Sequence, residues 1–190
     1  MRLFTRIYNL LLFPAKEWKS IADENNSRKT IYKQFIVPIL CITSFAIIIG
    51  TWINTSREVY SFGYVIYRII FLWATISAGL YISAFFVTEI MAQQLAARNN
   101  KRDFALIAYS SIAAYLVIII VSLFPFFSEM YVLAFYSLYL YLTGIQHILK
   151  QAEVKTRMTY ALLSFIIIMF VHLLLFFLFK RILSALLLSN

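Results

Sequence analysis

The sequence predicts an all-α protein: a polytopic membrane helix bundle with five transmembrane helices and an N-terminal amphipathic helix at the membrane surface. Hydrophobic residues make up 63% of the 190 positions and charged residues only 13%, against about 45–50% and about 25% in soluble proteins. The apolar runs reach about 20 residues, enough to cross a hydrocarbon core of about 30 Å, and they have no polar face. Basic stretches separate some of the runs, as residues 98–103 do between two of them.

Residues 2–13 form the expected amphipathic helix. Its polar side chains recur at the spacing of one helical face, as Arg2, Thr5, Arg6 and Asn9. Because Leu, Ile and Phe cover the rest, we expect this helix to lie in the membrane surface, with Arg2 and Arg6 on anionic headgroups. A secretory signal peptide begins in a similar way, but no small-x-small cleavage site follows Phe13.

A second short surface helix is expected over residues 15–25, after Pro14, which fits the first turn of a helix. Trp18 lies on its apolar side and is the expected anchor in the headgroup region. The two helices make a cytoplasmic, interfacial segment over residues 1–30, and residues 31–190 make the transmembrane domain.

The transmembrane domain divides at its polar stretches into five expected spans. Their approximate ranges are 33–52, 64–88, 104–123, 131–149 and 159–179. Thirteen of the 17 Lys and Arg residues lie at or before the first residue of the first span or in the turns after the second and fourth spans. Because basic residues accumulate on the cytoplasmic side, we expect a cytoplasmic N-terminus and a C-terminus on the opposite side of the cell membrane, which is the inner membrane in a bacterium.

No motif in the sequence indicates an enzyme. HExxH, GxSxG, Walker A and GxGxxG patterns are missing, and His147 and His172 have no carboxylate at metal-ligand spacing. A single cysteine, Cys41, excludes a disulfide framework within one chain. We therefore expect no catalytic residue, cofactor or metal. The net charge of +9 sits beside the apolar runs, where lipid headgroups and not nucleic acid are the expected partner.

Three polar residues of the spans are the candidate functional residues: Glu89, Arg68 and His172. His172, within the fifth span, is either a hydrogen-bond partner of a neighbouring helix or part of a proton pathway. Glu89 is either an acid that reaches headgroup water or a functional group, and Arg68 is expected to reach water or an acidic partner. The second span also carries two small-xxx-small pairs, made by Ala74, Ala78, Gly79 and Ser83, which permit close helix contact.

Three stretches resemble the Yip1 domain family of membrane proteins, and within it the short bacterial members. They are residues 13–21 (FPAKEWKSI), 104–110 (FALIAYS) and 138–144 (LYLYLTG), together with Pro38 at the entrance to the first span. The resemblance implies five spans and a cytosolic N-terminus. In the family a proline often follows the tyrosine of the third span, whereas here residues 112–114 are Ile-Ala-Ala. Eukaryotic members work with small GTPases in vesicle traffic, and the bacterial members have no known biochemical role.

We expect an integral membrane protein that acts by interaction and not by catalysis. Its expected partners are membrane lipids and other membrane proteins, with further copies of the same chain among them. The alternative is a small transporter or channel in which Glu89, Arg68 and His172 line a polar path. One shared water-filled cavity would favour transport, whereas separate pairing at helix contacts would favour a scaffold.

Overall fold

The computed structural model describes residues 3–24, 26–54, 62–95, 100–148 and 154–188, and these ranges contain helices and short turns without a β-strand. In chain order the helices are α1 (Leu3–Leu12), α2 (Pro14–Glu24), α3 (Arg28–Ile31), the π-helix η1 (Tyr32–Ile36), α4 (Val37–Asn54), α5 (Phe62–Leu95), α6 (Asn100–Ser110), α7 (Ile112–Leu123), the 3₁₀-helix η2 (Pro125–Phe135), α8 (Tyr136–Ile148) and α9 (Val154–Leu188). The all-α class is therefore confirmed.

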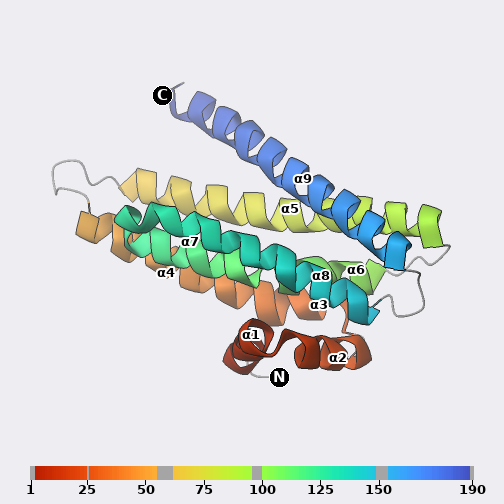
Figure 1. Cartoon of the computed structure of the whole chain (residues 1–190). Coiled ribbons are helices and arrows are strands. Elements are labelled where there is room, and N and C mark those ends of the chain that lie inside the picture. Colours follow the sequence, from red (N-terminus) through yellow and green to blue (C-terminus); the bar gives the residue numbers. More distant parts are fainter. Residues whose placement is uncertain (1–2, 25, 55–61, 96–99, 149–153, 189–190) are drawn as a thin grey trace.

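The long helices lie side by side, and the direction of the chain alternates from one to the next (Figure 1). α1 and α2 form a hairpin along one flank of this bundle; α1 lies toward the middle of its length, and α2 lies near the end where α3 and α6 begin and α8 ends. We call this the hairpin end. α9 packs against α5, crosses it at an angle, and its C-terminal part leaves the bundle.

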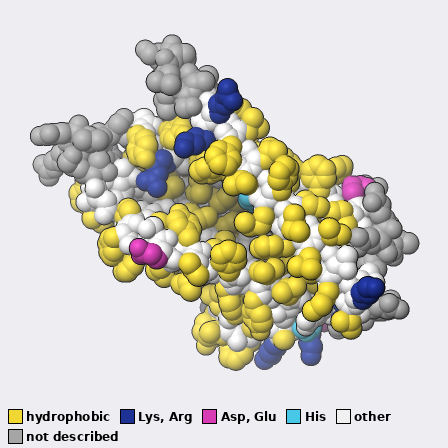
Figure 2. Space-filling model, turned by 45° about the horizontal axis from the view of Figure 1, so that its top comes forward, with side chains coloured by type: hydrophobic (Ala, Val, Ile, Leu, Met, Phe, Trp, Pro, Cys, Tyr) yellow, Lys and Arg dark blue, Asp and Glu magenta, His cyan; other side chains and the backbone are white. Residues whose placement is uncertain are grey.

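Four helical stretches are long and apolar enough to cross a membrane: Arg28–Asn54, Phe62–Ile90, Lys101–Leu123 and Val154–Ile182. They correspond to the first, second, third and fifth of the expected spans. The first begins at Arg28 and not at residue 33, because Ser27 caps α3: its hydroxyl accepts a hydrogen bond from the Thr30 amide at 3.1 Å. Figure 2 shows hydrophobic side chains over most of the visible face, with charged groups mostly near its margins. Such a surface suits a lipid environment.

The fourth expected span, residues 131–149, is not one regular α-helix. Residues up to Phe135 belong to η2, which Pro125 opens, and α8 has only 13 residues. Phe127 departs from helical dihedral angles, so the segment bends near its start. At about 2.0 Å per residue in η2 and about 1.5 Å in α8, the two helices together still extend about 40 Å along α7 and back to the hairpin end.

Close helix contacts occur at glycines. A Cβ atom at Gly50 of α4 would collide with the Ser122 carbonyl oxygen of α7, and the Asn54 side chain donates to the Leu123 carbonyl at 3.0 Å beside this contact. Gly79 of α5 faces His172 of α9 in the same way. The small residue expected to permit close packing at position 79 thus does so.

The largest apolar cluster lies where the hairpin meets the bundle. It joins Leu10 and Trp18 of the hairpin to Phe35 of η1, Phe104 of α6 and Tyr141 of α8, all of them buried. α9, in contrast, exposes most of its apolar side chains. The core therefore fixes the hairpin to the bundle, and α9 joins it near its start through Tyr160 and Ala161.

Candidate functional site

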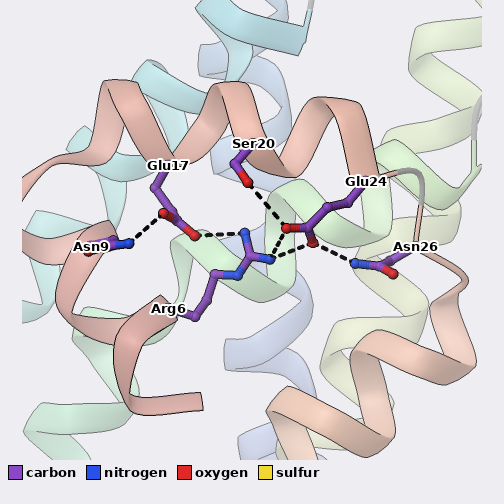
Figure 3. Close-up of polar contacts among 6 residues, drawn as sticks. All are labelled: Arg6, Asn9, Glu17, Ser20, Glu24 and Asn26. Carbon is purple, nitrogen blue, oxygen red and sulfur yellow. Dashed lines mark hydrogen bonds and ion pairs between the residues drawn. The ribbon is translucent and has the colours of Figure 1, made fainter. Parts of the chain in front are cut away.

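A buried arginine joins the two helices of the hairpin. Arg6 of α1 is only 4% exposed, and its guanidinium lies between two carboxylates of α2 (Figure 3). Nη1 lies 2.8 Å from Oε1 of Glu17, and Nη2 donates to both carboxylate oxygens of Glu24, at 2.5 Å to Oε1. The two acids are seven residues apart, two helical turns, so they face Arg6 from the same side of α2.

Three further side chains complete this network. Asn9 donates to Oε2 of Glu17 at 2.9 Å, while Ser20 and Asn26 donate to Glu24 at 3.2 and 2.7 Å. Because removing charges from water costs free energy, a buried ion pair fixes geometry more than it adds stability. The network therefore sets how α1 folds back on α2.

The hairpin contacts the bundle through Trp18. Its indole is fully buried, and the Tyr109 ring of α6 meets it edge-on with the ring centroids 6.4 Å apart. A Cβ atom at Gly144 of α8 would lie 2.8 Å from Trp18 ring carbons and 2.6 Å from a Leu106 methyl. The Arg6 guanidinium lies 5.2 Å from the centroid of the same Tyr109 ring, within the range of a cation–π contact. The stretches 13–21, 104–110 and 138–144 thus meet at one junction.

Two of the expected membrane anchors lie elsewhere than the sequence suggested. Arg6 and Trp18 were expected at the lipid surface, yet both are buried in protein. The expectation treated each helix alone, whereas α1 and α2 bury these side chains against each other and against α6 and α8. The spacing of Glu17 and Glu24 is the signal that could have identified a partner for Arg6. Arg2, the third expected anchor, lies outside the described residues.

A second polar group, which sequence reasoning missed, lies inside the hairpin end of the bundle. Four helices contribute its buried side chains: Thr88 of α5, Asp103 of α6, Tyr141 of α8, and Tyr160 and Ser164 of α9. Thr88 lies beside the Asp103 carboxyl group, and Ser164 beside the two tyrosine hydroxyls. Oδ2 of Asp103 and both tyrosine hydroxyls have no hydrogen-bond partner in the described part of the chain. Asp103 stands next to a basic turn in the sequence, where it resembles an ordinary solvated residue.

The three candidate residues of the spans occupy separate positions. Arg68 donates to the Thr51 hydroxyl of α4 at 3.3 Å. The Nδ1 atom of His172 lies 2.8 Å from the Ile168 carbonyl oxygen of its own helix, and its ring packs on Gly79. Glu89 is half-buried near the opposite end of α5 from Arg68.

The structure does not bring Arg68, His172 and Glu89 together. Arg68 and Glu89 are 21 residues apart on α5, or about 31 Å along the helix axis. His172 contacts the helix about midway between them, at Gly79. Among the described residues, no group of three or more His, Cys, Asp or Glu side chains has the arrangement of a metal site.

The sequence model of the Yip1 domain matches residues 8–176, a range that contains all three stretches of the junction. No curated protein and no solved structure matches the chain. The match confirms the resemblance seen in the sequence, and the apolar helices agree with a membrane protein. The chain is a membrane protein that belongs to the Yip1 domain family.

Proposed function

We propose that this protein acts by binding lipids and other membrane proteins, without catalysis, through a hairpin held at the surface of the membrane. The observation that carries the proposal is the outer face of α1. Phe4, Tyr8 and Leu12 follow one another at four-residue spacing and are 73%, 57% and 57% exposed, while Arg6 and Leu10 face inward. An exposed apolar stripe of this kind is typical of a helix that lies in the headgroup region.

The proposal includes five membrane passes. η2 and α8 together make the fourth pass, since their combined length of about 40 Å exceeds a hydrocarbon core of about 30 Å. The hairpin end faces the cytoplasm of the cell membrane in this arrangement. Basic side chains support this orientation because the hairpin end carries Lys16, Lys19, Arg28, Lys29, Lys33, Lys101, Arg102, Lys155 and Arg157, whereas Arg68, Lys180 and Arg181 are the described ones at the other end.

Single spin labels on α1 test the membrane contact. Cys41 is exposed, so it is first replaced by Ala and then single cysteines are placed along α1 in the full chain. Labels at positions 4, 8 and 12 should be accessible to lipid-soluble oxygen, while a label at position 10 should be protected from both oxygen and water-soluble reagents. Water accessibility at positions 4, 8 and 12 would contradict the proposal.

A reporter that is active only outside the cytoplasm tests the orientation. Fused after Asn190 it should be active, and fused within residues 98–102 it should be silent. Activity at the second position would overturn the five-pass arrangement.

Transport remains a second candidate function, with Glu89, Arg68 and His172 as its polar residues. Arg68 and Glu89 lie far apart along α5, and His172 of α9 contacts α5 between them, which favours pairing at individual helix contacts, such as the Arg68–Thr51 contact. The interaction role is therefore the one that the arrangement of the described side chains supports better.

A further inference from the structure

An open cavity of about 230 Å³ lies between the hairpin and the first long helix. Its polar lining comes from Arg6, Glu24 and Asn26 on the hairpin side and from Gln34 of η1, and the rings of Phe35 and Tyr109 form its aromatic wall. The cavity has room for one small polar group together with some water. A π-helical segment contributes two of its lining residues, and such segments often occur at functional sites.

The ion-pair network on the hairpin side of this cavity is net negative, although the whole chain is basic and Lys33 follows close by in the chain. The Arg6 guanidinium is opposed by the carboxylates of Glu17 and Glu24, so one negative charge is left over. Glu24 is also the last residue of α2, and the carbonyl end of a helix carries partial negative charge. The cavity therefore attracts a cation more than an anion.

The hydrogen-bonding groups define which cation fits. A primary ammonium group has three donors and no acceptor. The cavity offers the amide oxygens of Asn26, whose nitrogen is turned to Glu24, and of Gln34, whose side chain is exposed. The Glu24 carboxylate already accepts from Arg6, Ser20 and Asn26 and contributes its negative charge. Phe35 and Tyr109 also line the cavity, and aromatic rings stabilise a cation that lies over their faces, as Arg6 already does at Tyr109.

The position of the cavity indicates where the ammonium comes from. Gln34 and Phe35 belong to the stretch that begins the first membrane-crossing helix, and α1 beside them turns its apolar stripe outward. Lys33, adjacent to Gln34, is exposed and basic, which suits a phosphate group next to the ammonium. We propose that this cavity binds the headgroup of an aminophospholipid, with a primary ammonium in the cavity and the phosphate near Lys33. The inference rests on the membrane contact of α1 proposed above.

A methylation series tests the inference in the full chain, reconstituted in lipid nanodiscs or studied by native mass spectrometry. Phosphatidylethanolamine, its N-methyl and N,N-dimethyl forms and phosphatidylcholine share the phosphate and, when matched, the acyl chains, but lose one donor at each step. Affinity should fall along the series, by about tenfold or more overall, because hydrogen bonds to a charged group are lost. Equal affinity along the series would overturn the inference.

Two matched variants locate the site. Gln34→Leu changes an exposed side chain outside the Arg6 network, so the hairpin stays folded and the preference for phosphatidylethanolamine should disappear. Gln146→Leu is the same change at another exposed position of the hairpin end and should leave the preference intact. If Gln34→Leu keeps the preference for phosphatidylethanolamine, the cavity is not the headgroup site. If soluble phosphoethanolamine competes as strongly as the lipid, the ligand is not a lipid headgroup.

The labels on α1 separate this inference from the proposed function. Lipid contact at positions 4 and 8 together with a flat methylation series would reject the headgroup site alone. Water contact at those positions would reject the membrane location and, with it, the lipid as the source of the ammonium.

Discussion

The indole of Trp18 rests directly on Gly144, with its Cε2 and Cζ2 atoms 2.8 Å from the position that a Cβ atom at residue 144 would occupy. The contact joins α2 to α8 across 126 positions of sequence. A Leu106 methyl carbon lies closer still to this position, at 2.6 Å, so two side chains leave no room for a Cβ atom at residue 144. The hairpin can pack here on the bundle because residue 144 has no side chain.

Gly144→Ala is therefore expected to destabilise the protein, although alanine is the better helix former by about 1 kcal/mol. Overpacking at a site of this kind costs about 1–3 kcal/mol, so the melting temperature in detergent should fall. Gly63→Ala, at an exposed position of α5, is the matched control and should leave the melting temperature unchanged or raise it. Equal behaviour of the two variants would mean that Trp18 moves aside without cost.

Arg6→Gln removes the only cation between Glu17 and Glu24 in the hairpin network of Figure 3. The Glu17 carboxylate would then be buried without its cation, and breaking a buried ion pair costs about 3 kcal/mol or more, whereas water screens the more exposed Glu24. We expect a lower melting temperature and faster proteolysis near Phe13, as α1 leaves α2. Lys16→Gln removes an exposed charge from the same hairpin and should change neither measurement.

The apolar runs were sufficient to predict the all-α class and the four long helices, because a run of about 20 residues without a polar face has few alternatives to a membrane-crossing helix. The amphipathic spacing of residues 2–13 likewise predicted α1. The periodicity of a single helix did not predict the surroundings of a side chain that a second helix contacts. The spacing of residues 2–13 is the same whether Arg6 contacts lipid headgroups or a second helix. Only the fold places Glu17 and Glu24 next to its guanidinium.

The buried polar group around Asp103 could not be predicted from the sequence for a related reason. Asp103 follows Lys101 and Arg102 directly, so its neighbours in the chain suggest solvent. Its burial depends on Tyr141 and Tyr160, which approach from helices far along the chain. The 3₁₀-helix η2 was not predicted, because a 3₁₀-helix and a regular α-helix can carry the same apolar side chains.

Gly79 and His172 provide a test of the contact between α5 and α9. A Cβ atom at residue 79 would lie 2.6 Å from Nε2 of His172, so Gly79→Leu should separate the two helices and lower the melting temperature. His172→Ala in the same chain frees the space, and the double variant should regain part of the loss. A coupling of about 0.5–3 kcal/mol is expected for residues in direct contact. Additive effects would show that His172 does not pack on Gly79.

Tyr32 and Tyr160 allow one chemical change, the loss of a hydroxyl group, to be compared in two environments. The hydroxyl of Tyr32 lies 2.7 Å from the Ser77 hydroxyl of α5, and Tyr32→Phe should therefore cost about 1 kcal/mol, the usual contribution of a hydrogen bond. The hydroxyl of Tyr160 is buried without a partner among the described residues.

Tyr160→Phe removes a group whose burial is not compensated, and the melting temperature should stay the same or rise. Both variants keep the aromatic ring and its packing, so the difference between them isolates the hydroxyl. Thermal unfolding of the two variants in one detergent measures it. A loss at Tyr160 as large as that at Tyr32 would mean that the Tyr160 hydroxyl is hydrogen-bonded in the membrane, which would make the polar group around Asp103 a connected network.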